Sequence, residues 1–151
     1  MSLNDNCLKA SIVYIAEVKL NKNIKEEENQ QQQEVCSKVY LGTAANTFKE
    51  QFRNHKLSLT NDRYKYNASL SKYIWKLKEG QVPFQVHWSA VGKAPTYTPS
   101  TKICHLCNLE KTLILLSKEE ISLNKKSKLM SKCRHKAKNL LCKYSTLYLA
   151  S

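Results

Sequence analysis

The stretch SIVYIAEVK, residues 11–19, is the most strongly patterned part of this chain. It is rich in β-branched and aromatic residues, the types that are enriched in strands. Alternate side chains of a strand point to the same face, and here one face would carry only apolar residues. The stretch therefore predicts a strand with one buried face, formed by Ile12, Tyr14, Ala16 and Val18.

A second strand is expected over residues 34–41, where Val35, Val39 and Leu41 are apolar, and we expect Gly42 to end it. The residues between the strands are different in character, with three consecutive Glu and a run of Gln. Such a segment buries little apolar surface, so residues 20–34 are predicted to be a flexible polar loop. The two strands would then form a hairpin with an enlarged loop.

Apolar residues at helical spacing follow the second strand and predict a helix from a cap at Asn46 or Thr47 to about Leu59, with His55 on the inward stripe. A second helix is expected from a cap at Ser69 to a stop at Gly80. The remaining predicted elements are a third strand over 83–89, a loop over 94–100, a helix over 104–117 and a short basic helix over 127–140.

This order of elements predicts a small α/β (α+β) fold in one domain, residues 1–143, followed by a tail over 144–151. The chain has 151 residues, of which 42% are hydrophobic, so it can form one packed core. No apolar run is long enough to span a bilayer, and we expect no membrane association. Residues 1–10 lack the apolar stretch of a signal peptide, so the protein is expected not to be secreted.

The net charge is +13, from 25 Lys and Arg against 12 Asp and Glu. Residues 102–143 alone carry eleven basic and three acidic side chains. A basic surface attracts polyanions, of which nucleic acid is the leading candidate and an acidic membrane surface the second. Of these two, DNA and not a membrane is the partner that we expect. The alternative is a solvated basic tail without a specific partner.

The six Cys of an unsecreted chain are expected to be reduced thiols or metal ligands. Cys104 and Cys107 are spaced to hold one tetrahedral ion, and Cys133 and His135 offer a second pair of ligands. A zinc ion held by four protein ligands would be structural. The alternative is that the first pair are small buried residues without a metal. Cys7 is a spare candidate, and Cys36 and Cys142 are interpreted as ordinary thiols.

Glu110 shares its predicted helix face with Leu106, Leu113 and Ile114. A carboxylate buried among such residues needs a partner, which could be a divalent cation or a nearby Lys. Tyr14 and Tyr40 lie on the two hairpin strands, where a phenol could donate, accept or take a proton. Aromatic residues also suit strands for structural reasons alone.

Several segments resemble, in order and spacing, the GIY-YIG endonuclease domain attached to reverse transcriptases of Penelope-like retroelements. The resemblance covers about residues 3–141 and is carried by NCL at 6–8, IVY at 12–14, YLG at 40–42, NTFK at 46–49, NHK at 54–56, LSKYIW at 70–75, LK at 77–78, Cys104, LC at 106–107, EK at 110–111, LNK at 123–125 and CRH at 133–135.

The resemblance implies a three-stranded, mainly antiparallel sheet flanked by helices, and hydrolysis of DNA phosphodiester bonds. It implies that Glu110 holds a Mg²⁺ or Mn²⁺ ion and that Tyr14 and Tyr40 position or activate the attacking water. His55 would join this network, and Asn124 would lie near it. Basic residues expected to contact nucleic acid are Arg53, Lys56, Lys125, Lys126 and Arg134.

One departure from the family pattern concerns the arginine expected four residues before His55, where this chain has Gln51. Arg53 lies on another side of the helix and cannot simply replace it. Loss of a cation that faces a phosphoryl transition state slows such reactions by orders of magnitude. The sequence therefore leaves three hypotheses: a nicking endonuclease in the nucleus, an inactive zinc-stabilised DNA-binding module, and a basic structural protein of a ribonucleoprotein.

Overall fold

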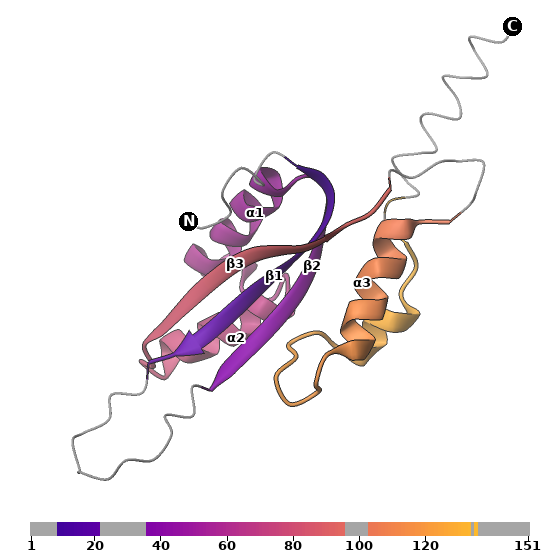
Figure 1. Ribbon diagram of the computed structural model, residues 1–151. Helices are drawn as coiled ribbons and strands as arrows, with labels where there is room; N and C mark the ends of the chain where they lie inside the picture. Colours follow the sequence, from indigo (N-terminus) through magenta and orange to yellow (C-terminus); the bar gives the residue numbers. More distant parts are fainter. Residues whose placement is uncertain (1–8, 22–35, 96–102, 134, 136–151) are drawn as a thin grey trace, which may run out of the picture.

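The computed structural model describes residues 9–21, 36–95, 103–133 and 135 (Figure 1). The elements are, in chain order, β1 (Ala10–Leu20), β2 (Ser37–Thr47), α1 (Phe48–Thr60), the short 3-10 helix η1 (Asp62–Tyr64), α2 (Ser69–Glu79), β3 (Phe84–Lys93), α3 (His105–Leu116) and the 3-10 helix η2 (Lys126–Met130). The α+β class, the three antiparallel strands and the three main helices agree with the prediction. The predicted loop over 20–34 begins one residue too early, since Leu20 is the last residue of β1. The rest of that loop from residue 22, the tail over 144–151 and most of the loop over 94–100 lie outside the described residues.

β1 is the central strand of a sheet with the order β2-β1-β3, and both pairings are antiparallel. A central strand has neighbours on both sides that satisfy its backbone groups, so it can be buried on both faces. Val13, Ala16 and Val18 are accordingly 0% exposed. The predicted buried face of Ile12, Tyr14, Ala16 and Val18 is confirmed. The strand is not exposed on its other face, however, because Val13 on that face is buried as well.

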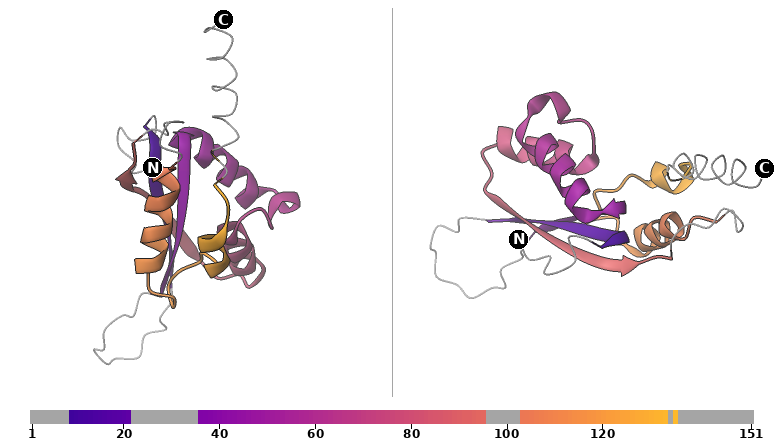
Figure 2. Two further views of the ribbon diagram at one scale, coloured as in Figure 1. Left: turned by 90° about the vertical axis from the view of Figure 1, so that its right-hand side faces the viewer. Right: turned by 90° about the horizontal axis from the view of Figure 1, so that it is seen from above.

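The two faces of the sheet are covered by different helices. α1 and α2 pack on the face that carries Ile12, Tyr14 and Ala16, whereas α3 packs on the opposite face against Val13 and Leu41. The left-hand view in Figure 2 shows α3 and the pair α1 and α2 on opposite sides of the strands. A side chain of α3 must therefore meet those of α1 at an edge or end of the sheet.

Gly42 does not end the second strand, contrary to our expectation. β2 continues through Gly42 to Thr47 and leads directly into α1. The reason is the register, which places Gly42 opposite Tyr14, where a Cβ at Gly42 would overlap the Tyr14 phenol. The glycine is needed for this close approach of a side chain and not for a turn.

The start of α2 also differs slightly from the prediction. Ser69 is the first residue of the helix and Ala68 precedes it as the N-cap. The hydroxyl that serves the helix start belongs to Ser71, which accepts from the Ala68 amide at 3.1 Å and lies 2.9 Å from the Ala68 carbonyl.

The basic helix expected over residues 127–140 is wrong where the structure describes it. Only Lys126–Met130 form a 3-10 turn, and residues 131–133 are not helical. The Ser131 hydroxyl donates to the Lys128 carbonyl at 2.6 Å, a local bond that competes with helix propagation. Residues 136–140 lie outside the described part of the chain.

The segment before η2 extends the outer edge of β2. Val39 donates its amide to the Ile121 carbonyl at 2.7 Å and accepts from the Leu123 amide at 2.8 Å, in a parallel bridge with Ser122. This pairing covers part of a sheet edge that would otherwise expose unpaired backbone groups. Across the part of the chain that the structure describes, no helix is long and apolar enough to cross a bilayer.

Candidate active site and metal centre

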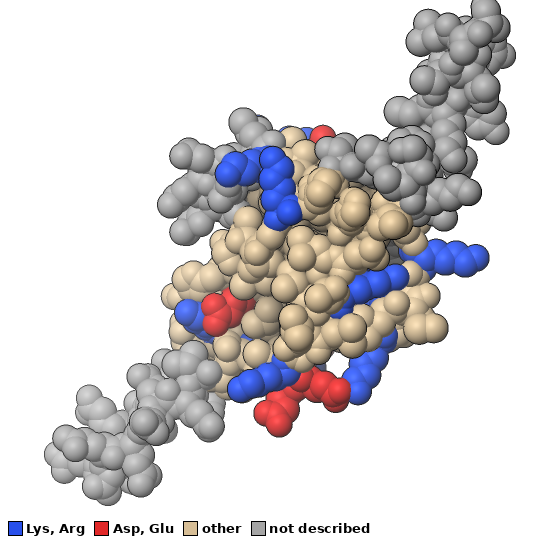
Figure 3. All heavy atoms as spheres, turned by 45° about the vertical axis from the view of Figure 1, so that its right-hand side comes forward, with Lys and Arg blue, Asp and Glu red and all other residues tan. Residues whose placement is uncertain are grey.

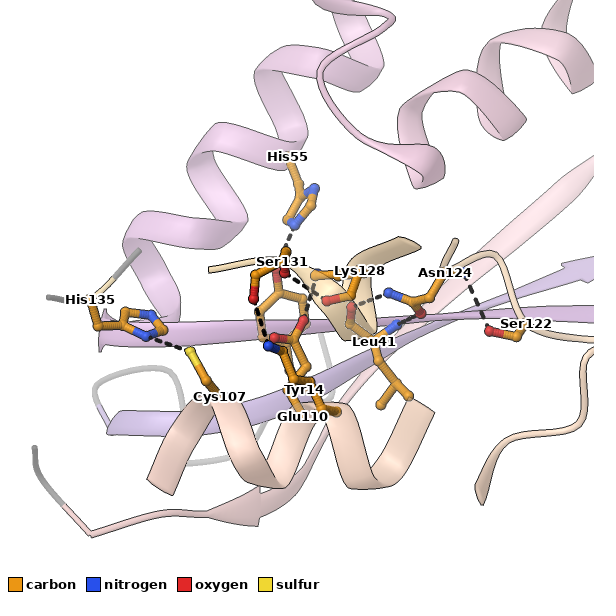
Figure 4. Close-up of polar contacts among 11 residues, drawn as sticks. Tyr14, Leu41, His55, Cys107, Glu110, Ser122, Asn124, Lys128, Ser131 and His135 are labelled. Carbon is orange, nitrogen blue, oxygen red and sulfur yellow. Dashed lines mark hydrogen bonds and ion pairs between the residues drawn. The ribbon is translucent and has the colours of Figure 1, made fainter. Parts of the chain in front are cut away.

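A hydrogen bond joins Tyr14 of β1 to His55 of α1. The Tyr14 hydroxyl lies 2.6 Å from His55 Nε2, and the two side chains come from elements that are 41 positions apart (Figure 4). Both residues are buried, with 2% and 8% of their surfaces exposed. Because helical spacing turns His55 inward and the strand turns Tyr14 toward α1, each predicted site residue points at the other.

Burial holds this pair in its neutral form. Burial, and then the nearby Tyr40 and Glu110, raise the pKa of Tyr14 well above its usual value. Burial, and then the Lys128 ammonium, lower the pKa of His55 to about 4. At neutral pH the phenol keeps its proton and donates it to Nε2, provided that the imidazole proton is on Nδ1.

Two further aromatic residues surround His55. The ring of Tyr40, from β2, lies 5.7 Å from the His55 ring, and that of Trp88, from β3, lies 5.3 Å away. Tyr40 and Trp88 both pair with Ala16, one on each side of β1, so the strand register brings the two rings to the same face. The family resemblance assigned Tyr40 to the site, whereas Trp88 falls within the predicted strand over 83–89 and was not assigned to it.

Glu110 reaches this region from α3 and is 5% exposed. The Lys128 ammonium lies 2.5 Å from Glu110 Oε1, so the alternative of a lysine partner is realised in the structure (Figure 4). Among the described residues, Oε1 nevertheless accepts no hydrogen bond. A buried carboxylate oxygen of this kind fits a divalent cation such as Mg²⁺ or Mn²⁺, which prefers oxygen ligands.

Lys128 is the residue that sequence reasoning missed. It lies in η2, and its Nζ is 5.7 Å from the centre of the Tyr40 ring as well as in contact with Glu110. It therefore connects the carboxylate of α3 with the aromatic side chains on the other face of the sheet. Lys128 is one of several Lys in a basic segment, and no periodicity distinguishes it from its neighbours.

Asn124 acts on the backbone of β2. Its Oδ1 accepts from the Leu41 amide at 2.7 Å, and its Nδ2 donates to the Leu41 carbonyl at 2.8 Å (Figure 4). This side chain thus continues the edge pairing that Ile121 and Leu123 make with Val39. Since Leu41 follows Tyr40, Asn124 fixes the strand that carries the second tyrosine.

The predicted basic contacts lie on the surface. Arg53 and Lys56 are exposed on α1, while Gln51 is half-buried one helical turn before His55. Lys125 and Lys126 are exposed near η2, and Lys126 pairs with Glu119. On the face shown in Figure 3, Lys and Arg are spread around a largely uncharged middle and do not form one continuous patch. Arg134 lies outside the described residues.

Four side chains near the start of α3 could hold a metal ion. The ligand atoms of Cys104, Cys107, Cys133 and His135 all lie within 4.8 Å of one another. His135 Nδ1 is 3.4, 3.1 and 3.6 Å from the sulfurs of Cys104, Cys107 and Cys133, and the sulfurs of Cys107 and Cys133 are 3.3 Å apart. Metal bonds of about 2.0–2.3 Å in a tetrahedron give edges of roughly 3.5–3.8 Å, so the set is close to that size.

The chemistry of the cluster also fits a cation. Burial, and then the hydrogen bonds that the Cys107 thiol makes to the sulfurs of Cys133 and Cys104, raise the pKa of Cys107. A bound cation offsets this cost, because it stabilises the thiolate form. Cys36 is an exposed free thiol, as interpreted from the sequence, and Cys7 and Cys142 lie outside the described part of the chain.

Comparison of the chain with protein-family models, with curated proteins and with solved structures gives no match in any of the three.

Proposed function

We propose that this protein is a metal-dependent DNA endonuclease of the GIY-YIG type, which nicks DNA by hydrolysing a phosphodiester bond. The observation that carries the proposal is the Tyr14–His55 hydrogen bond of 2.6 Å, made beside Tyr40 and with the buried Glu110 carboxylate close enough to raise the pKa of Tyr14. These four side chains come from β1, α1, β2 and α3. A structural core has no need of a carboxylate, a phenol and an imidazole at one point, whereas phosphoryl transfer does.

The side chains of the chain have distinct roles in this reaction. The Tyr14 oxygen positions the attacking water, and the neutral His55 Nε2 takes the phenol proton as the water gives up its own. Tyr40 lies beside His55, with the two ring centres 5.7 Å apart, and would contact the phosphate. Glu110 would hold Mg²⁺ or Mn²⁺, which when bound polarises a phosphoryl oxygen and stabilises the leaving oxygen.

The surface charge supports a nucleic-acid substrate. With a net charge of +13, the chain attracts a polyanion without requiring a specific sequence. Arg53, Lys56 and Lys125 are exposed and free to contact DNA phosphates, and a DNA substrate favours a nuclear location. The four-ligand cluster would bind structural zinc, since four protein ligands leave no position for a substrate.

Incubation of supercoiled plasmid with the protein and Mg²⁺ tests the activity. We expect nicked circles from the wild type and a loss of at least about 100-fold in Glu110→Gln, because the carboxylate that holds the ion is gone. Glu119→Gln is the matched control, since Glu119 is 72% exposed and should leave the rate unchanged. No nicking by the wild type, or equal nicking by both variants, contradicts the proposal.

A second function, a zinc-stabilised DNA-binding module without catalysis, is favoured by two observations. Gln51 stands where the resembling family has arginine, and the Lys128 ammonium lies on the carboxylate proposed to hold the metal. Gln51→Arg discriminates between the functions. A gain in nicking on the order of 100-fold supports a weakened nuclease, and DNA binding without any gain supports the module.

A further inference from the structure

Glu110 already has a cation beside it. Lys128 Nζ lies 2.5 Å from Glu110 Oε1, and the two residues come from separate elements, η2 and α3 (Figure 4). Glu110 is nearly fully buried, so its negative charge needs a positive partner. Lys128 supplies it.

The contact uses Glu110 Oε1, a buried oxygen that could also coordinate a metal ion. Oε1 accepts no hydrogen bond within the described residues, so the ammonium meets it as an ion pair alone. An ammonium and a divalent ion on the same carboxylate oxygen would lie within a few ångströms of each other and repel strongly in a buried setting. Both cations cannot occupy this position together.

The position of Lys128 allows its side chain to move away from Glu110. η2 contains no buried residue, and the Lys128 side chain is 34% exposed whereas that of Glu110 is 6% exposed. Movement of Lys128 toward solvent therefore uncovers little apolar surface and leaves the carboxylate in place.

We propose that Lys128 and a divalent metal ion are alternative partners of Glu110, with Lys128 holding the carboxylate while the metal is absent. This rests on the proposed function insofar as Glu110 is taken as the metal ligand. Lys128 is then a tethered competitor, which lowers the affinity of the site for the metal and keeps the carboxylate ordered without it.

The test measures Mn²⁺ binding to the full chain without DNA, from the electron paramagnetic resonance signal of free Mn²⁺. We expect Lys128→Met to bind Mn²⁺ at the Glu110-dependent site about tenfold more tightly than the wild type, because a nearby positive charge is removed. Lys126→Met is the matched control, since Lys126 lies in the same short helix but pairs with the exposed Glu119. Glu110→Gln identifies which part of the binding belongs to this site.

Thermal unfolding supplies a second readout. Lys128→Met leaves the buried carboxylate without its counterion, so its melting temperature should fall and Mn²⁺ should restore it. Should Lys128→Met fail to fold, Lys128→Arg tests the competition by strengthening the partner of Glu110 instead of removing it. The guanidinium can hold the carboxylate with two hydrogen bonds, so Mn²⁺ should bind more weakly than to the wild type.

The proposal is overturned if Lys128→Met binds Mn²⁺ with the same affinity as the wild type. It is also overturned if Lys128→Arg binds Mn²⁺ as tightly as the wild type, or if Mn²⁺ binding is unchanged in Glu110→Gln. The result is separable from catalysis. Tighter binding by Lys128→Met without any nicking supports the competition and contradicts the nuclease, whereas nicking with unchanged Mn²⁺ affinity does the reverse.

Discussion

Gly42 is the residue whose size allows the Tyr14 ring to lie where it does. A methyl group at this position would overlap the Tyr14 hydroxyl, which is fixed by its bond to His55. We expect Gly42→Ala to lower the free energy of unfolding by about 1–3 kcal/mol, because the buried phenol has to shift. Urea unfolding measures this change.

Gly80→Ala is the matched control. Its added Cβ would meet the Lys76 carbonyl at 3.5 Å, an ordinary contact, and its φ of −80° suits alanine. This variant should stay within about 0.5 kcal/mol of the wild type. Similar losses in both variants would mean that Gly42 matters for its backbone and not for Tyr14.

His55 makes stability depend on pH. Its pKa is about 4 in the folded protein and 6.5 in the unfolded chain, so the unfolded chain binds more protons between these values. The stabilisation that His55 contributes to the folded protein is therefore complete above pH 6.5 and is lost as the pH falls toward 4. From these two values we expect His55 to lower the free energy of unfolding by about 2 kcal/mol between pH 7 and pH 5.

Urea unfolding of the wild type and of His55→Gln at both pH values isolates this contribution, because every other titratable group is present in both proteins. The wild type should lose more stability than the variant on acidification. Parallel losses would show that His55 is charged in the folded state.

At the scale of elements, strands and helices with a regular apolar period could be predicted, because burial of one face is a local pattern. The alternation at Ile12, Tyr14 and Ala16 predicted β1, and helical spacing brought His55 inward. The prediction that Gly42 ends the second strand was wrong, because the role of this glycine is set by Tyr14 on the neighbouring strand and not by the preference of glycine for turns.

The contacts made by the segment after α3 could not be predicted from local pattern. Lys128 meets Glu110 across two elements, and Ser122 pairs with the edge of β2 from far along the chain. Asn124 could be assigned to the site only from the family resemblance, and the pairing with Leu41 had no signal in the sequence. Such contacts depend on how elements pack, which periodicity does not encode.

Asn124 is expected to hold the edge of β2. Asn124→Ala removes the partners of the Leu41 amide and carbonyl, which should cost about 1–3 kcal/mol and speed hydrogen exchange at the Leu41 amide. Asn108→Ala, on the exposed side of α3, is the control. Unchanged hydrogen exchange at the Leu41 amide in Asn124→Ala would mean that the two hydrogen bonds from Asn124 do not restrain β2.

At the scale of the whole molecule, the Cys–His cluster joins the start of α3 to the chain beyond η2. Cys104 and Cys107 lie at one end of the segment 104–135, and Cys133 and His135 lie at its other end. A bound ion would therefore join the two ends and restrain the residues between them, which include Glu110, Asn124 and Lys128. The Lys111 ammonium, 2.6 Å from the Ser131 carbonyl, braces the same stretch.

Removal of zinc should therefore loosen this stretch while β1, β2, β3, α1 and α2 keep their own core. We expect one zinc per wild-type chain by elemental analysis, and in Cys107→Ser a loss of the zinc and a fall in melting temperature on the order of 10 °C. Cys36→Ser removes an exposed thiol and serves as the control. Because the ion is proposed to fix the stretch that carries Glu110 without touching the reacting groups, Cys107→Ser should weaken Mn²⁺ binding and nicking together. Full Mn²⁺ affinity in a zinc-free chain would show that packing of α3 against the sheet is enough to place the carboxylate.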